Sequence, residues 1–198
     1  MKNIHTSGTV VLPSPRTGGG KPLMAALAAR ISTREFSVRK LPQQLLSDLL
    51  WAADGINRVQ TAGRTAPSAK DWREIDIYLV REEGLDAYHP ATHSLQQVLR
   101  RDLRLATGIQ EFVGIAPLNL IYVADLTRVD VADDMERRFY CAADAAFIAQ
   151  NVYLFCASEG LACVVRGAVN RRELAQAMQL KETQRVILAQ TVGYPVSG

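Results

Sequence analysis

MERRFYCAADAAFIAQNVYLFCASEG, residues 135–160, contains no proline, and its only glycine is the last residue. Apolar residues occur nearly all round a helix drawn through this segment, which predicts a buried α-helix rather than a surface one. Gly160 supplies a C-cap, and at 1.5 Å per residue the helix would be about 39 Å long. We therefore expect a long helix running through the middle of the molecule.

The longest uncharged run of this segment, residues 145–158, is shorter than the ~18–20 residues that a membrane span needs. A core helix is therefore the main interpretation, and a helix that also forms a dimer interface is the alternative. Polar groups on a buried helix need partners. Three such residues favour the alternative: Asp144, Gln150 and Asn151.

Composition limits the class of protein. The chain has 198 residues, of which 48% are hydrophobic and 22% charged, so it can bury a good core as one domain. We expect an extended arm over residues 1–20 and a single domain over residues 21–198. The net charge of +3 is too small to argue for nucleic acid, although it suits a few basic residues around one anionic ligand. No secretion signal and no membrane association are expected.

The three cysteines, Cys141, Cys156 and Cys163, form neither a CxxC pair nor an even framework. Buried reduced thiols in a cytoplasmic protein are the expected state. His89 and His93 have a metal-like spacing, but Pro90 lies between them and no acid or cysteine is near. We interpret them as loop histidines and expect no metal site.

The rest of the chain alternates between helical and strand patterns. Helices are predicted at 22–30, 42–54, 94–112 and 170–180, and strands at 74–80, 84–90, 118–125, 161–165 and 185–195. In the last of these helices Asn170 is the N-cap and Glu173 occupies the N3 position of a capping box. This order predicts an α+β fold in which helices flank a mixed central sheet.

One basic segment follows the first predicted helix. In Arg30-Ile31-Ser32-Thr33-Arg34, two arginines and a serine occupy alternate positions. They can converge on one anion if the chain leaves the helix there, because guanidinium groups suit phosphate and serine adds a donor. Solvated arginines at a helix end are the alternative. The glycines of Gly18-Gly19-Gly20-Lys21 do not form a phosphate loop, since Pro15 and Pro22 break the pattern.

Four separated stretches together resemble the FMN-dependent nitroreductase family. Residues 30–34 match its basic-x-Ser-x-basic motif, Ala66-Pro67-Ser68-Ala69 its Pro-Ser loop, residues 160–167 (GLACVVRG) its Gly-Leu segment, and residues 192–195 its closing strand. The spacing is most similar to the SagB-type branch, which includes azoline oxidases. The resemblance covers about residues 20–196.

The resemblance implies a three-layer α+β sandwich and an intertwined homodimer with FMN at the interface. It implies that Arg30, Ser32 and Arg34, with Ile31 between them, hold the FMN phosphate and the pyrimidine edge of the flavin. Three further residues would pack on the flavin from the partner chain: Pro67, Ser68 and Ala69.

The same resemblance implies roles for the third stretch. Val164 and Val165 would lie against the isoalloxazine ring, and the backbone of Arg166 and Gly167 would approach N5. A glycine suits a backbone that comes close to a ligand. The implied reaction is a ping-pong transfer of hydride from NADH or NADPH through FMN to a small electron-poor acceptor, such as a nitroaromatic or a quinone. No strand–GxGxxG–helix unit is present, so a separate nicotinamide domain is not expected. The resemblance implies instead that the nicotinamide stacks directly on the flavin.

The chain departs from the family at several positions. No basic residue follows Tyr194, so one phosphate contact is either missing or supplied elsewhere. Arg166 replaces a residue that is often acidic, and it would either repel a nicotinamide or attract an anionic substrate. Azoline oxidases carry a Lys-Tyr pair where this chain has Arg137-Arg138-Phe139-Tyr140, which leaves Tyr140 as a candidate acid/base without a lysine. Trp72 either lines the pocket or packs at the surface.

Three hypotheses follow. The first is an NAD(P)H-dependent FMN oxidoreductase, whose bound flavin bleaches with the nicotinamide. The second is a SagB-like dehydrogenase of azolines or other heterocycles, whose flavin responds slowly to NAD(P)H. The third is a flavin-binding protein without turnover. All three imply a homodimer.

Overall fold

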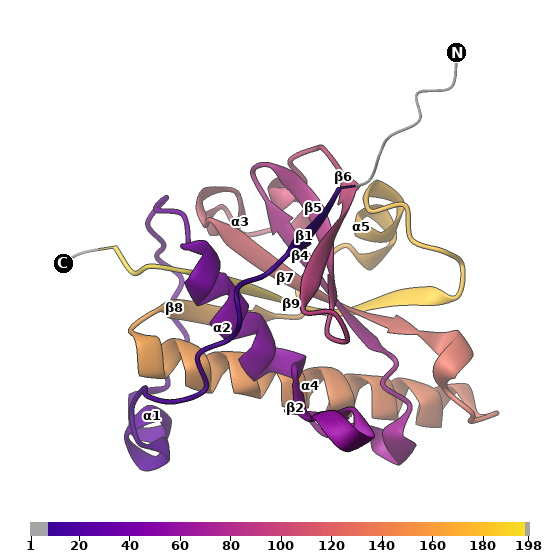
Figure 1. The fold of residues 1–198 in the computed structure, drawn as a ribbon. Coiled ribbons are helices and arrows are strands. Elements are labelled where there is room, and N and C mark those ends of the chain that lie inside the picture. Colours follow the sequence, from indigo (N-terminus) through magenta and orange to yellow (C-terminus); the bar gives the residue numbers. More distant parts are fainter. Residues whose placement is uncertain (1–7, 197–198) are drawn as a thin grey trace.

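The computed structural model describes residues 8–196, which form a seven-stranded sheet, a separate two-stranded sheet and helices (Figure 1). The strands of the large sheet are β1 (Thr9–Val11), β4 (Ile75–Arg81), β5 (Gly84–His89), β6 (Ser94–Leu99), β7 (Leu118–Asp125), β8 (Ala162–Arg166) and β9 (Gln184–Gly193). The small sheet pairs β2 (Ile56–Arg58) with β3 (Gly63–Arg64). The α-helices are α1 (Leu23–Ala29), α2 (Gln43–Asp54), α3 (Phe112–Ile115), α4 (Asp134–Glu159) and α5 (Arg171–Ala177).

The strand order of the large sheet is β1-β6-β5-β4-β7-β9-β8, and every neighbouring pair is antiparallel. The α+β class is confirmed. The expectation of a mixed sheet is wrong, because the strands of this sheet pair only in the antiparallel direction. β1 comes from the predicted N-terminal arm and pairs with β6, so this part of the arm extends the sheet. Residues 1–7 of the arm lie outside the described residues.

The predicted helix over residues 94–112 is wrong. Residues 94–99 instead form β6, which returns along β5 with Tyr88 opposite Leu95. The turn between these strands begins at Pro90 and places His93 at a φ of 45°, in the left-handed region. The remaining residues form a short 3₁₀ turn, Arg104–Thr107, and the four-residue α3.

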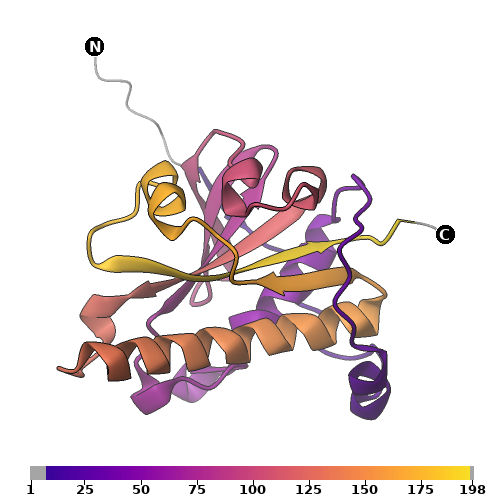
Figure 2. The same ribbon diagram turned by 180° about the vertical axis from the view of Figure 1, so that it is seen from behind.

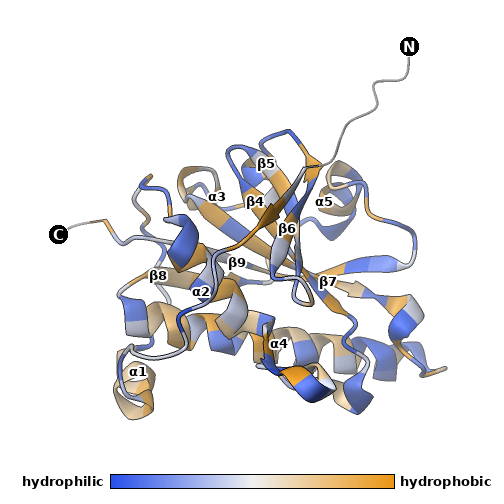
Figure 3. Cartoon of the chain, in the orientation of Figure 1, coloured by the Kyte–Doolittle hydropathy of each residue, from blue (hydrophilic) through white to orange (hydrophobic). Residues whose placement is uncertain are grey.

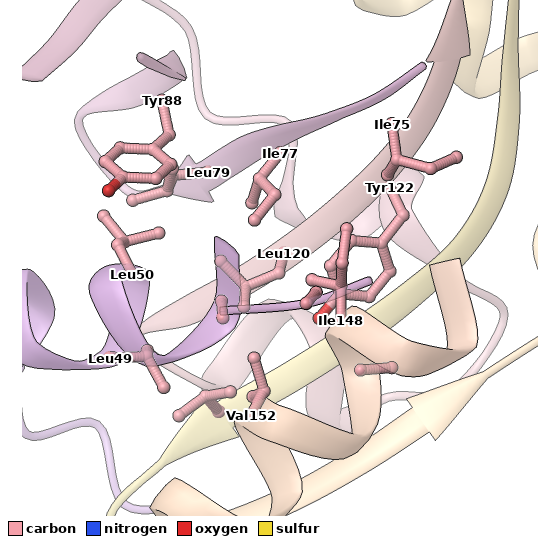
Figure 4. Close-up of a cluster of buried hydrophobic side chains, with 14 of the residues drawn as sticks. Leu49, Leu50, Ile75, Ile77, Leu79, Tyr88, Leu120, Tyr122, Ile148 and Val152 are labelled. Atoms are coloured by element: carbon pink, nitrogen blue, oxygen red, sulfur yellow. The ribbon is translucent and has the colours of Figure 1, made fainter. Parts of the chain in front are cut away.

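Helices cover both faces of the sheet, which gives the predicted three layers (Figures 1 and 2). Alternate residues of β7 point to opposite faces. Leu120 and Tyr122 join the core beneath α2 and α4, whereas Ile121 and Val123 join the core beneath α5. Figure 3 shows the central strands as predominantly hydrophobic, and Figure 4 shows Leu49, Tyr122, Ile148 and Val152 among the side chains of the first core.

The long helix α4 has the predicted ends. The Asp133 side chain accepts a hydrogen bond from the Glu136 amide at its start, and Gly160 ends it with a φ of 70°. Its burial is narrower than predicted, because one stripe faces the core while Phe139 and Phe147 are 67% and 47% exposed. By length and composition alone α4 could also cross a membrane, a test that the core helices of soluble proteins pass as well. Its inner stripe packs on the sheet core.

The polar residues of α4 differ in their partners. Asp144 is buried and accepts a hydrogen bond from the Ala69 amide at 2.8 Å. Asn151 donates to the Ala53 carbonyl at 3.3 Å, whereas Gln150 is exposed. All three cysteines are free thiols buried in the core, as the sequence predicts.

His93 fastens the N-terminal arm to α2. Its Nε2 lies 2.7 Å from Ser47 Oγ, and its Nδ1 lies 2.9 Å from the Tyr88 hydroxyl. Ser47 donates its only hydroxyl proton to the Pro13 carbonyl. Nε2 therefore donates to Ser47, and in neutral His93 the Nδ1 atom then accepts from the Tyr88 hydroxyl. Burial lowers the pKa of His93 accordingly.

Acid should therefore weaken the fold through His93. Because the pKa of His93 is lower in the folded state, the unfolded chain binds more protons, and stability decreases as pH falls below about 6.5. We expect the loss of unfolding free energy in His93→Gln, measured by urea denaturation, to shrink between pH 8 and pH 5. His89→Gln, at the exposed end of β5, is the control and should show no such trend. A His93→Gln effect that is constant over this pH range would contradict the assigned tautomer.

Candidate active site

The basic segment after α1 lies against the second half of α4. The chain leaves helical geometry at Arg30, whose ψ is 119°, so the following residues are extended as the anion hypothesis requires. The Thr33 amide donates to the Cys163 carbonyl at 2.9 Å, which holds the segment beside β8. The Arg30 guanidinium lies 5.5 Å from the centre of the Tyr153 ring. Ile31 and Arg34 point outward and are exposed.

Tyr153 joins two of the predicted motifs, although the sequence did not single it out. Its hydroxyl lies 2.9 Å from Ser32 Oγ and accepts a hydrogen bond from the Val165 amide at 2.8 Å. Residues 30–34 and residues 164–167 are thereby brought together in the described structure. The available signal was a single tyrosine in the apolar run of residues 152–157 within α4.

The two valines of β8 face opposite ways. Val164 is 2% exposed and packs with Phe36 and Ala116, whereas Val165 is half-buried on the α4 side. A flat ligand on either face of this strand therefore meets the side chain of only one of them. The backbone at Gly167 is open, because a Cβ built there would meet no atom within 4 Å.

The guanidinium of Arg166 points into the protein. It donates to the Thr107 carbonyl at 2.6 Å, to Asn119 Oδ1 at 3.0 Å and to Thr191 Oγ1 at 3.0 Å. The residue is only 4% exposed, and burial lowers its pKa to about 10. Both sequence-based interpretations of Arg166 required a side chain that faces the ligand. In this structure the group instead holds β8 to the neighbouring elements.

The Pro-Ser loop forms a second group, at the first half of α4. Its backbone is anchored by the bond from the Ala69 amide to Asp144, and Ser68 Oγ accepts from the Arg73 amide at 2.9 Å. Pro67 is exposed. Three non-glycine residues nearby have positive φ angles, at Lys70, Asp71 and Arg73. Such backbone strain is concentrated at ligand sites.

A cavity of about 210 Å³ lies beneath this loop and is rich in charged groups. Asp54 is paired with Arg64 at 2.7 Å, yet burial raises the pKa of Asp54 to about 7. Burial also raises the pKa of Glu74, which lies near Asp144. The thiol of Cys141 borders Glu74. Burial raises the pKa of this thiol to about 12, so the thiol is unreactive near neutral pH.

Tyr140, the predicted acid/base candidate, packs edge-on against Trp72 with 5.5 Å between ring centres. The Lys70 ammonium lies 5.1 Å from the Trp72 ring centre. Trp72 does not line the cavity beneath the loop.

The two groups of motif residues are separated along α4. One is anchored at Asp144 and the other at Tyr153, and nine residues of α-helix span about 13 Å. No hydrogen bond within residues 8–196 links residues 30–34 to residues 67–69.

The model of the nitroreductase family matches residues 27–194 of this chain. The chain belongs to the nitroreductase family. A protein of Methanocaldococcus jannaschii named as a nitroreductase is 35% identical over 167 residues, which cover 79% of this chain and 83% of that one. The region matched by the family model contains residues 30–34, 66–69 and 160–167, and it ends at residue 194, within the fourth motif.

Solved structures of nitroreductases have the same architecture. A crystal structure described as a nitroreductase from Ralstonia eutropha has a TM-score of 0.91 and 46% identity, covering 96% of this chain and 90% of that one. The NADPH:FMN oxidoreductase of Vibrio harveyi, solved with NAD⁺, has a TM-score of 0.66 at 21% identity. That match covers 88% of this nitroreductase and 69% of the other chain, and it supports the fold alone.

Replacing Tyr153 by phenylalanine should loosen β8 at the candidate site. The variant leaves the Val165 amide without its acceptor, and we expect a loss of about 1–2 kcal/mol in unfolding free energy. Hydrogen exchange should accelerate at the Val165 amide, while Tyr194→Phe serves as a control because no hydrogen bond involving the hydroxyl of Tyr194 is seen among the described residues. Unchanged exchange at Val165 would show that the Tyr153 hydroxyl does not hold this strand.

Proposed function

We propose that this nitroreductase is an FMN-dependent oxidoreductase that works as a homodimer. The observation that carries the proposal is the meeting of the basic segment and β8 at Tyr153, next to an open backbone at Gly167. The residues present fit a flavin phosphate and ring. Arg30 and Ser32 are half-buried, and Arg34 is exposed with no carboxylate within 4.0 Å among residues 8–196.

In this proposal Arg30, Ser32 and Arg34 hold the anionic and polar parts of FMN. The face of β8 that carries Val165 lies against the flavin ring. Because Gly167 has no side chain, the backbone there can approach the same ring. When bound, FMN would supply hydride transfer at N5, from NADH or NADPH to an electron-poor acceptor such as a nitroaromatic or quinone. The arginines also favour a reduced cofactor that carries negative charge. Arg166 acts only in positioning, since its guanidinium is buried among Thr107, Asn119 and Thr191.

Two observations support the dimer. Pro67, Ser68 and Ala69 lie about 13 Å along α4 from the Tyr153 junction, so a second chain is the simplest way to bring this loop to the same flavin. Apolar side chains are also exposed on α1 and α4, a pattern that marks interaction surfaces. They are Leu23, Met24, Leu27, Phe139 and Phe147. In both views α1 stands off from the sheet beside the end of α4 (Figures 1 and 2).

A SagB-like dehydrogenase of heterocycles and a flavin-binding protein without turnover remain the alternative functions. Tyr140 is half-buried against Trp72, and its contacts among the described residues are aromatic packing contacts. The alternatives are therefore distinguished by the response of the bound flavin. A cytoplasmic location is part of the proposal and rests on the reduced cysteines.

Absorbance spectroscopy tests the proposed cofactor. Purified protein titrated with FMN should show the flavin bands, and anaerobic NADH or NADPH should bleach them. Arg30→Met should weaken FMN binding at least tenfold because it removes a charge from the phosphate site, whereas exposed Arg101→Met should change it less than twofold. Bands that persist with both nucleotides but bleach with a thiazoline substrate would favour the SagB-like function. Flavin bands that persist with every donor would favour a flavin-binding protein without turnover. A failure to bind FMN would refute the proposal.

Sedimentation velocity tests the dimer. The wild-type chain should sediment as a dimer, since an interface between intertwined chains buries upwards of about 2,000 Å². Phe147→Glu should shift the population toward monomer and weaken FMN binding in parallel. Val98→Glu changes a 40% exposed residue on β6 and should leave the dimer intact. A wild-type monomer that still binds FMN would exclude a site shared between two chains.

A further inference from the structure

A second cavity, of about 500 Å³, lies between the first turns of α4, the start of α5 and the start of β9. Basic and apolar residues divide its lining. Four arginines contribute, Arg137, Arg138, Arg171 and Arg185, against a single acid, Asp134. The apolar wall contains Leu126, Val186 and Ile187.

The arginines of α4 lie on the turns that precede its core-facing stripe, where Arg137 is half-buried and Arg138 is exposed. Residues 134, 137, 138 and 141 follow the i, i+3, i+4, i+7 spacing of one helix face. Farther along, the same face carries Ala145, Ile148 and Val152, which are all buried. The stripe therefore changes from apolar to charged at the point where the cavity separates α4 from the sheet.

Most of these charges lack an opposite charge in the protein. Among residues 8–196 no carboxylate lies within 4.0 Å of Arg137, Arg171 or Arg185, while Arg138 pairs with Asp134 at 2.8 Å on the exposed side. Arg137 donates one N–H to the Val131 carbonyl at 2.5 Å, but its buried Nε has no acceptor. The Val131 carbonyl is the only acceptor of the Arg137 side chain among the described residues, so other N–H groups of this guanidinium are free to bind a ligand.

We propose that this cavity binds a small organic acid, with its anionic group on the arginines and its apolar body against Leu126, Val186 and Ile187. A guanidinium fork suits a carboxylate, sulfonate or phosphate. The volume lies in the usual range of ligand sites, about 300–1,000 Å³, and exceeds what an inorganic anion requires. The apolar wall explains why the ligand is organic rather than a free ion.

The site is separate from the proposed flavin site and the proposed dimer face. It shares no lining residue with the cavity beneath the Pro-Ser loop. Cys141, at its edge, is twelve residues from Tyr153, or about 18 Å along α4. Phe139 leaves the helix about 200° round from Arg137, so the exposed apolar side of α4 faces away from the cavity. The proposal therefore uses none of the residues assigned to the flavin, although Cys141 borders Glu74 at the cavity beneath the Pro-Ser loop.

Calorimetric titration with 2-naphthoate tests the inference, with neutral 2-naphthamide as the matched probe. Full-length protein saturated with FMN should bind the acid at least tenfold more tightly than the amide. Arg171→Met should weaken binding of the acid at least fivefold, and Arg137→Met at least tenfold. Arg172→Met is the control, because it removes the same charge from an exposed neighbour outside the lining and should change affinity less than twofold.

Arg137 also supports the Val131 carbonyl, so its variant is accepted only if its thermal midpoint matches that of the wild type. Arg171→Met provides the test if Arg137→Met does not fold. Equal affinity for acid and amide, or unchanged affinity in both arginine variants, would overturn the proposal. So would competition between 2-naphthoate and FMN in protein that is not saturated with FMN, because it would place the probe in the flavin site.

Discussion

The packing of the inner stripe of α4 on the sheet sets the position of each candidate functional residue. Small and medium side chains form this stripe, so the helix lies close to the strands: Cys141, Ala145, Ile148, Ala149, Val152 and Cys156. An α-helix rises 1.5 Å per residue, and a contact fixed at several points along it leaves little freedom to shift. The separation of two residues along α4 therefore sets the separation of the loops and strands that contact them.

Polar residues at the borders of this stripe connect the loops to the helix. A buried polar group must find a partner, and each of these residues finds it in a different segment. Asp144 receives the Ala69 amide, Asn151 reaches the Ala53 carbonyl, and Tyr153 receives the Val165 amide. The same interactions that satisfy the helix also place the two groups of motif residues at opposite halves of it. In the proposed homodimer, a second chain brings the two groups to one flavin.

The sequence allowed most of the fold to be predicted where local signals and tertiary packing agree. The C-cap of α4 at Gly160, the buried strand β7 and the Asn170 cap of α5 all appear as expected. The helix predicted at 94–112 fails because Leu95, Val98 and Leu99 also fit helical spacing. Pairing with β5 overrides that local preference. The number of strands was also underestimated. One cause is that β6 was predicted as a helix, and another is that edge strands such as β1 carry a weak pattern.

The candidate site shows a different limit of sequence analysis. Motif residues identify the segments that meet, as Ser32 and Val165 do, but not the side chain between them. Tyr153 gave no motif signal, because its role depends on the crossing of α4 and β8. Side-chain direction was also beyond reach. Alternation along β8 sends Val164 and Val165 to opposite faces, and burial directs Arg166 away from the open backbone at Gly167.

Arg166 and Arg137 show how the same residue type acquires opposite meanings. A buried guanidinium is stable only if its donors are satisfied. Arg166 meets that condition within the chain, through Thr107, Asn119 and Thr191, so its charge serves the structure. Arg137 does not meet it, because its buried Nε has no acceptor among the described residues. The residue also borders a cavity with three more arginines and a single acid, Asp134, already paired with Arg138. In the proposed site, an organic anion supplies the acceptors and the opposite charge that this cavity lacks.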